Sequence, residues 1–385
     1  MELSFFNVKD GYLEALVRGL RSGFLSADEY RRLAQCESID DMKLALEETD
    51  YGMFLQDEPS PIPSTVIGQK CREKLANEFR HLRSQANYPL SKFLDFLTVE
   101  KMIDNVVGLI QGTVNKKSPQ DLLGRVDPLG WFPEMKAIAS MDITSGYEEI
   151  YKTLLIDTPV GPYFESFLKQ VTPADSESRS MQEVASIFNE TDLELMKNML
   201  KKAWLEDFNA FCETLGGSTA EVMGHILKTN SDFRVMSVTL NSLNTMLGSS
   251  QQLGDRNLLY PSLGYLYPEG TDRIRKAWNE TTVRAALEPY KPYAALFDLC
   301  APYYSKERSG VTDIKQLKSL EDLIYEKEVE LCEFAFEQQF HYGVFYSWVK
   351  LREQEIRNIV WIADMISMGR KEHTEEIVPI FRPRY

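Results

Sequence analysis

The stretch "KLREQEIRNIVWIADMI", from Lys350 to Ile366, has the residue pattern that decides the fold class of this chain. Its apolar residues recur at positions i, i+3, i+4 and i+7, namely Ile356, Ile359, Val360 and Ala363. A helix with 3.6 residues per turn places such residues on one face. The stretch therefore predicts a long amphipathic α-helix whose apolar face belongs to the protein core.

The charged residues of this stretch have an ordinary interpretation as helix-surface pairs. Glu353 precedes Arg357 by four residues, which is the favourable orientation for an ion pair worth only about 0.2–0.5 kcal/mol. Glu355 also has cationic neighbours in sequence, whereas a catalytic general acid needs an apolar pocket that raises its pKa. The charges thus predict helix architecture first, with Glu353 and Arg357 as candidates for fixing the helix register, and a partner-binding face second.

Asn358 is the polar residue that this pattern places near the buried face. A buried amide side chain must be hydrogen-bonded and can fix the register of a helix against its neighbours. The order E-x-x-I-x-N-[VI]-V of residues 353–360 recurs in residues 100–107, "EKMIDNVV", which makes Asn105 a second register candidate. We expect Asn358→Leu to disturb helix docking and assembly more than Glu355→Gln does.

The composition is that of a globular protein with a sizeable core. Of 385 residues, 43% are hydrophobic and 26% are charged, and the formal net charge is −15. This balance disfavours nucleic acid and direct binding to anionic lipid, because both are bound mainly through basic patches. The start of the chain lacks the pattern of a secretory signal peptide, and no apolar run approaches the roughly 20 residues of a membrane span. We expect a cytosolic chain.

Helix starts are encoded as capping boxes, in which a Ser or Thr caps the helix and an acid three residues later bonds back. Five such boxes begin at Ser26, Ser38, Thr191, Ser218 and Ser319. No run of alternating β-branched residues ends in an Asn-Gly or Asp-Gly turn. The predicted fold class is all-α.

Weak internal repetition suggests how the helices are grouped. An aromatic-x-x-apolar step followed by a Ser-initiated capping box occurs three times along the chain. We expect three diverged helical units, at about residues 1–125, 126–250 and 251–381, within one continuous body that spans residues 1–385. Three pseudo-symmetric units around an axis would suit a central partner.

The search for catalytic chemistry finds no phosphate-binding loop, nucleophile elbow or zinc motif. Glu78 and His81 have the E-x-x-H spacing of di-iron bundles, but the second such pair is missing. The pair Asp40 and Asp41 lacks a third acid, and Asp41 is expected to cap a helix. Five scattered cysteines indicate neither a disulfide framework nor a zinc site. We expect no cofactor, no metal and no catalytic site.

One loop differs from the others in its aromatic content. "NLLYPSLGYLYPEG", from Asn257 to Gly270, contains two Tyr-Pro steps that favour extended backbone. Its tyrosines, Tyr260, Tyr265 and Tyr267, either pack on the core or meet a partner. Both interpretations stay open at this point.

Several long segments resemble the d subunits of V-type proton ATPases, a family to which the C-type stalk subunits of archaeal and bacterial A/V-type ATPases are related. They are residues 5–55, "LGWFPEM" at 129–135, "LLIDTPVGPYF" at 154–164, "LYPSLGYLYPEG" at 259–270, residues 320–366 and "VPIF" at 378–381. The resemblance covers nearly the whole chain. The family pattern ends near "PIF", so that residues 382–385, "RPRY", look like a C-terminal extension.

This resemblance implies a non-catalytic, funnel-like, three-fold pseudo-symmetric subunit on the cytosolic face of a vacuolar, lysosomal or other endomembrane. The family couples the central stalk, made of subunits D and F, to the proteolipid c-ring, and we also expect contact with subunit a. Membrane contact would then run only through other subunits. Phe5 and Phe6 are candidates for the ring-facing side, and Tyr260, Tyr265 and Tyr267 for loop contacts. Core packing is the alternative for each.

Two other classes of protein remain as alternatives. One is a cytosolic helical scaffold unrelated to rotary ATPases, which would not sediment with membranes. The other is an all-α enzyme that uses a metal or a diphosphate, built on Asp40, Glu78 or His81, which would carry stoichiometric metal.

Overall fold

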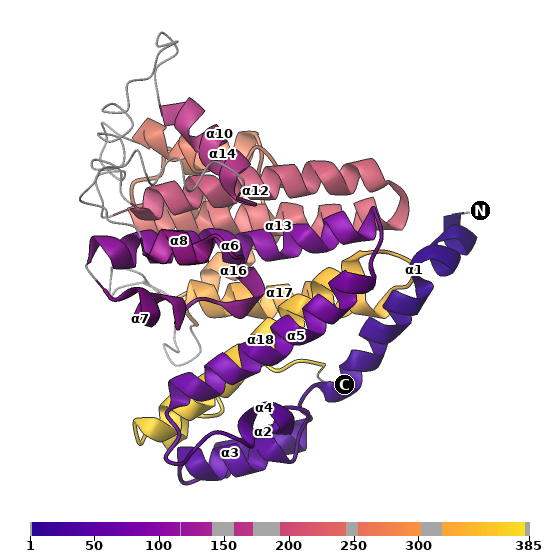
Figure 1. The fold of residues 1–385 in the computed structure, drawn as a ribbon. Coiled ribbons are helices and arrows are strands. Elements are labelled where there is room, and N and C mark those ends of the chain that lie inside the picture. Colours follow the sequence, from indigo (N-terminus) through magenta and orange to yellow (C-terminus); the bar gives the residue numbers. More distant parts are fainter. Residues whose placement is uncertain are drawn as a thin grey trace. The chain divides into compact units, whose positions relative to one another are not determined.

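The computed structural model describes residues 2–115, 117–140, 158–171, 193–243, 253–301 and 318–381. These residues form helices joined by turns and loops (Figure 1) and contain no β-strand, only an isolated bridge between Cys300 and Lys318. The predicted all-α class is confirmed. No helix in the described part of the chain combines the length and the apolar character that a membrane span requires.

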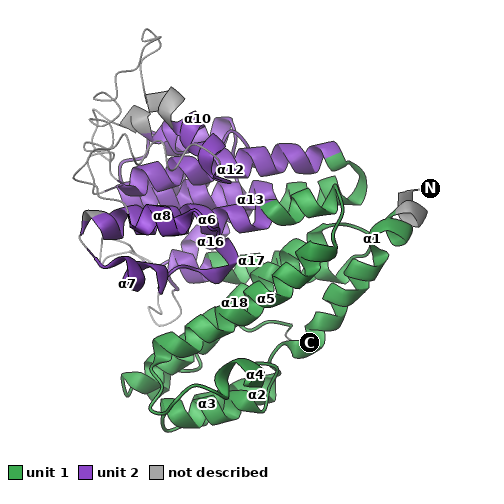
Figure 2. Ribbon diagram, in the orientation of Figure 1, with its two compact units in different colours: residues 1–95, 215–226, 324–385 green, residues 96–214, 227–323 purple. Residues whose placement is uncertain are grey.

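The chain divides into two compact units (Figure 2), and each unit is assembled from distant parts of the sequence. Unit 1 comprises residues 1–95, 215–226 and 324–385, and unit 2 comprises residues 96–214 and 227–323. The expected repeats at 1–125, 126–250 and 251–381 remain a prediction. The expected extension, 382–385, lies outside the described residues.

Unit 1 is built on two long helices that lie side by side, α5 (Ser64–Gln85) and α18 (Gly343–Ser367). The quoted stretch forms most of α18, and side chains from nearly all around this helix are buried, among them Trp348, Ile356 and Ile359. A helix buried this completely forms the centre of a core rather than a surface. The amphipathic pattern therefore underestimated the burial of α18.

Shorter helices surround this pair within unit 1. α1 (Glu2–Gly19) and α3 (Ile39–Glu47) contact α18, and α4 (Gly52–Leu55) contacts α5. η1 (Leu20–Gly23) follows α1, α2 (Ala27–Gln35) packs on α3, and η7 (Lys371–His373) packs on α18. α17 (Leu320–Glu337), of which residues 324–337 belong to unit 1, leads through a short turn into α18.

Three long helices form the body of unit 2: α6 (Leu90–Val114, from residue 96), α12 (Leu193–Leu215, to residue 214) and α13 (Gly217–Ser242, from residue 227). Phe96 stacks on Phe208 with ring centroids 5.0 Å apart, and the indole of Trp204 donates to the Phe96 carbonyl at 2.9 Å. Lys201 of α12 bonds Asp104 of α6 at 2.8 Å. Apolar stacking and ion pairs thus join α6 to α12.

The remaining elements of unit 2 are short helices. They are α7 (Pro119–Leu123), η2 (Pro128–Gly130), α8 (Met135–Ala139), α10 (Gly161–Val171), η5 (Leu253–Leu258), α14 (Glu269–Ile274), α15 (Glu280–Leu287) and α16 (Lys291–Asp298).

The predicted capping boxes have mixed outcomes. Those at Ser26 and Ser38 are confirmed with both reciprocal hydrogen bonds, and Ser319 caps α17 through the Asp322 amide at 3.0 Å. The box at Ser218 is wrong, because α13 already begins at Gly217. Gly216 and Gly217 have positive φ angles of 65° and 53°, so a glycine turn separates α12 from α13. Thr191 lies outside the described residues.

Candidate functional site: a buried charge network in unit 1

The most unusual feature of unit 1 is an ion pair buried inside its core. Arg352 and Glu355 lie one turn apart on α18, with Nη1 2.6 Å from Oε1, and both residues have no exposed surface. The prediction that the charges of this stretch are ordinary surface pairs is therefore wrong for these two. Burying two charges costs several kcal/mol per ion unless further hydrogen bonds satisfy them, so the remaining contacts of the pair decide its role.

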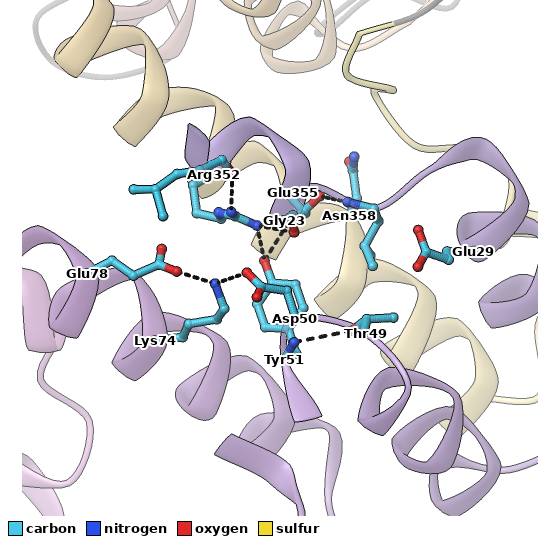
Figure 3. A network of polar contacts seen from close by, with 12 residues as sticks. Gly23, Glu29, Thr49, Asp50, Tyr51, Lys74, Glu78, Arg352, Glu355 and Asn358 are labelled. Atoms are coloured by element: carbon cyan, nitrogen blue, oxygen red, sulfur yellow. Dashed lines mark hydrogen bonds and ion pairs between the residues drawn. The ribbon is translucent and has the colours of Figure 1, made fainter. Parts of the chain in front are cut away.

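Both oxygens of Glu355 have partners from the N-terminal part of the chain. The Leu25 amide donates to Oε2 at 2.7 Å. The hydroxyl of Tyr51 (Figure 3) donates to Oε1 at 2.6 Å. The pKa of the Glu355 carboxyl lies above its usual value, because the effect of burial exceeds the lowering by Arg352 and by these two hydrogen bonds. The carboxylate thus joins α18 to the segment between α1 and α4.

Arg352 contacts the same N-terminal segment from its other side. Its guanidinium donates to the carbonyls of Gly23 at 2.9 Å and Leu20 at 3.3 Å, and it lies 4.1 Å from the centre of the Phe24 ring. Its Nε atom is buried without a hydrogen-bond partner. The cation is held by carbonyl dipoles and an aromatic face as well as by Glu355.

A second, linked group of charges connects α5 to this segment. Lys74 is buried and bonds Asp50 at 2.6 Å and also Glu78, and its ammonium lies 5.3 Å from the centre of the Tyr51 ring (Figure 3). A Cβ at Gly23 would collide with the Asp50 carboxylate. Glycine at position 23 therefore allows the backbone to approach both charge groups closely. We call the whole set, listed next, the charge network. Its members are Gly23, Leu25, Asp50, Tyr51, Lys74, Glu78, Arg352 and Glu355.

Asn358 lies one turn after this network and contacts a different segment. It is buried, its Nδ2 donates to the Val378 carbonyl at 2.6 Å, and its Oδ1 accepts the Val378 amide at 3.2 Å. Gln354 donates to the same Oδ1 at 2.9 Å. The amide side chain therefore fastens the segment that follows α18 back onto the helix. Its role in helix register remains a prediction.

Asn105 makes an equivalent arrangement in unit 2. Its Nδ2 donates to the Asp127 carbonyl and its Oδ1 accepts the Asp127 amide, each at 2.9 Å. In both units an asparagine on a long helix thus pairs with the backbone of a non-helical segment about 20 residues later.

Glu353 and Arg357 have contacts other than the predicted pair. Glu353 lies 3.5 Å from Lys350, whereas Arg357 donates to Gln354 and stacks 3.6 Å from the ring centre of Tyr325 on α17. Arg357 therefore links α18 to α17 through its planar guanidinium, which is a suitable group for stacking on an aromatic ring.

The tyrosine loop, residues 257–270 of unit 2, rests on a buried aspartate. Asp232 of α13 accepts the amides of Tyr265 at 2.9 Å and Leu266 at 3.1 Å and the hydroxyl of Tyr293 at 2.5 Å. Gly264 has φ of 123°, and a Cβ there would collide with the Asp232 carboxylate. The sequence pattern missed Asp232, because its partners lie more than 30 residues away.

The three tyrosines of this loop have different surroundings. Tyr260 is only 4% exposed, and its hydroxyl bonds Thr239 at 2.6 Å, so it packs in the core of unit 2. Tyr265 and Tyr267 are about half exposed, with the buried Leu266 between them. Of the three partner-contact candidates, the structure presents these two on the surface.

The two N-terminal phenylalanine candidates are placed differently. The side chain of Phe5 is not among those described. Phe6 is half-buried, with ring centroids 6.3 Å from Phe340 and 5.6 Å from Tyr342 in the turn before α18. Phe6 thus packs α1 onto unit 1.

The rejected catalytic candidates have structural partners. Glu78 pairs with Lys74, His81 lies 2.8 Å from Gln85, and Asp41 caps α3. Among the described residues, no group of three or more His, Cys, Asp or Glu side chains is arranged to hold a metal ion. What the charge network can do is hold distant segments of unit 1 in one geometry.

The sequence is similar to known proteins over almost its entire length. Residues 13–377 match the family described as ATP synthase (C/AC39) subunit. The protein named V-type proton ATPase subunit d in Dictyostelium discoideum is 43% identical, covering 98% of this chain and 96% of that protein. Proteins of the same name in Neurospora crassa and Saccharomyces cerevisiae are 41% and 33% identical, each covering 99% of this chain and 100% of its relative.

Proposed function

The chain belongs to the C/AC39 subunit family of ATP synthases, and on this premise we propose that it serves as the d subunit of a V-type proton ATPase. In this role it performs no catalysis. It couples the central stalk of subunits D and F to the proteolipid c-ring, so that rotation driven by ATP hydrolysis moves protons.

The observation that carries this proposal is the near-complete coverage in both directions. Relatives that are named for this subunit align with 97–99% of this chain and with 96–100% of their own length. If the chain shared only one domain with these relatives, the alignment would span only part of this chain or only part of the relative. The proposal therefore concerns the whole chain.

The charge network gives a physical reason why unit 1 suits such a role. A coupling subunit must transmit torque without deforming, and an apolar core alone tolerates sliding between helices. Glu355 and Arg352 instead fix α18 to residues 20–25 through directional hydrogen bonds at 2.7–3.3 Å. Lys74 does the same between α5 and Asp50. Directional hydrogen bonds inside a core favour one arrangement of the helices over its alternatives.

The partners follow from the proposed role. The chain would contact subunits D and F, the c-ring and subunit a, and would reach the membrane only through them, on the cytosolic face of an endomembrane. Three pseudo-symmetric repeats around an axis would supply the central socket. Phe5, Phe6, Tyr260, Tyr265 and Tyr267 remain the candidates for contact, and among those whose side chains the structure describes, Tyr265 and Tyr267 are the exposed ones. Permanent interfaces of this kind bury on the order of 2,000 Å² or more.

Affinity purification of the tagged chain from gently solubilised membranes tests the proposal. We expect mass spectrometry to find the proteolipid, D and F subunits, with ATPase activity that a V-type-specific inhibitor abolishes. An unrelated tagged soluble protein, taken through the same steps, is the control. Recovery of the chain alone, or with soluble partners that never sediment with membranes, would favour the unrelated helical scaffold instead.

A further inference from the structure

Helix α1 has two faces of opposite character, and the face toward unit 1 contains its acids. Asp10 and Glu14 are buried beside the apolar Leu13 and Val17. Asp10 accepts the Tyr342 hydroxyl at 2.7 Å. Neither carboxylate is available on the outer surface of the helix.

Glu14, on the same inner face, contacts the turn between α17 and α18. It pairs with Arg18 at 2.7 Å and accepts the Phe340 amide at 3.2 Å, while Arg18 donates to the Phe336 carbonyl at 2.6 Å. The charges of α1 that face unit 1 are thus paired within unit 1. The opposite face of the helix carries exposed side chains.

The outer face of α1 carries apolar and small residues in a heptad pattern. Val8 is 89% exposed and Tyr12 is 67% exposed, and Ala15 and Gly19 are exposed as well. Their spacing of four, three and four residues is that of alternating a and d positions in a coiled coil. Phe5 precedes Val8 by three residues and extends the same pattern in the sequence. We call Val8, Tyr12, Ala15 and Gly19 the outer seam.

The positions that flank the outer seam carry no exposed acid. Lys9 is exposed directly beside Val8, and the described side chains of α1, Phe6 to Gly19, contain no acid other than the buried Asp10 and Glu14. In a chain with net charge −15 this is a local reversal of charge. Residues that flank a coiled-coil seam choose partners through charge, so the seam is complementary to an acidic helix.

We propose that the outer seam of α1 docks one helix of another subunit, which presents its own apolar seam flanked by acidic residues. The inference rests on the proposed function for the assembly in which this partner occurs. Small residues at positions 15 and 19 let the partner backbone come close, and no atom lies within 4 Å of a Cβ placed at Gly19. Val8 and Tyr12 supply the larger side chains that insert between residues of the partner.

Two other occupants fit these observations less well. A helix that lies in a lipid surface has a broad apolar face and a strongly basic polar face, whereas this seam is narrow and the opposite face of α1 is packed against protein. A second copy of this chain would bring a second basic flank, with Lys9 facing like charge instead of an acid. An acidic protein helix satisfies both the spacing and the charge.

A photo-crosslinking amino acid, p-benzoylphenylalanine, at position 12 tests the docking in the intact, gently solubilised complex. Tyr88 is exposed in the same unit and offers a matched tyrosine control. We expect the probe at position 12, and not the probe at position 88, to crosslink to an acid-flanked helix of another subunit. Crosslinks to lipid, to unit 2 or to a second copy, or no crosslink from position 12, would overturn the inference.

Charge reversal provides a second readout that separates docking from assembly. With the probe at position 12, Lys9→Glu should lower the crosslink yield about threefold to tenfold, because it replaces an attraction by a repulsion. Lys9→Arg should preserve the yield. Equal yields for both variants would contradict the acidic partner. If the chain purifies without pump subunits, the proposed function fails, yet a crosslink to an acidic helix would still support the docking.

Discussion

Glu355→Gln is the substitution that most directly tests the charge network. It removes one negative charge, keeps the size of the side chain and leaves Arg352 buried without an ionised partner. Glutamine also presents an NH2 group where the carboxylate accepted hydrogen bonds from Tyr51 at 2.6 Å and from the Leu25 amide at 2.7 Å. At least one of these donors loses its acceptor.

The expected loss is large compared with the total stability of a domain. Removal of one partner from a buried ion pair costs about 3–5 kcal/mol, and a buried donor without an acceptor costs about 1–3 kcal/mol. Since the two terms overlap, we expect a loss of about 3–5 kcal/mol from a total that is typically about 5–15 kcal/mol. The double variant Arg352→Met/Glu355→Gln should recover at least about 1 kcal/mol, because no unpaired cation remains.

Urea-dependent amide exchange measured by mass spectrometry can assign the loss to unit 1. Peptides from α18 report on the network, and peptides from α12 give a reference in unit 2. The control is Glu330→Gln, which removes an exposed pair with Lys327 at 2.7 Å and should cost less than about 1 kcal/mol. If Glu355→Gln and Glu330→Gln destabilise α18 equally, the network does not hold unit 1 together.

Three further predictions concern single side chains. Asn358→Leu should release Val378 and cost about 2 kcal/mol, seen as faster proteolysis of residues 370–381; unchanged proteolysis would contradict this. Burial lowers the pKa of His341 below its usual 6.5, so the unfolded chain binds this proton first and stability should fall as the pH drops below 6.5. When the pH falls from 7.5 to 5.5, the free energy of unfolding of the unsubstituted protein should drop by up to about 1.4 kcal/mol more than that of the His341→Leu variant, as measured by urea titration. Equal drops in the two proteins would exclude the effect. Asp232→Asn and Gly264→Ala should each loosen the tyrosine loop and speed proteolytic cleavage within residues 257–270. If both variants resist cleavage as well as the unsubstituted protein does, Asp232 does not anchor the loop.

The ranking of the two α18 substitutions changes once burial is known. The sequence pattern ranks Asn358→Leu above Glu355→Gln, because Glu355 has cationic neighbours on the helix. In the structure Glu355 is as buried as Asn358 and also forms an ion pair with Arg352. We now expect Glu355→Gln to be the more damaging change.

Much of the local structure could be predicted because its causes are local. The capping boxes at Ser26 and Ser38 depend on residues only three positions apart, and the helical stripe around Ile356 depends on one helix. The error at Ser218 has a local cause too, since the glycines at 216 and 217 make the turn two residues too early for Ser218 to cap α13.

The charge network could be predicted only in part. Arg352 and Glu355 lie seven and four residues before Ile359, so all three residues share one face of the helix. This shared face indicates burial, whereas the order of charges along the helix does not. Their partners could not be found in this way, because Leu25 and Tyr51 are more than 300 residues away. The same three-residue spacing also occurs in exposed pairs, so spacing alone does not distinguish a surface pair from a core pair.

The separation of 330 residues between Leu25 and Glu355 has a consequence for biogenesis. While the ribosome is still making the chain, the N-terminal segment lacks the carboxylate and the guanidinium that complete its core. Contacts between residues this far apart in the sequence form slowly, and the chain must be nearly complete before they can form. Truncated products that end before α18 therefore expose unsatisfied polar groups and apolar surface, which are features that quality-control proteases can recognise, so that incomplete subunits are removed before they reach an assembling complex.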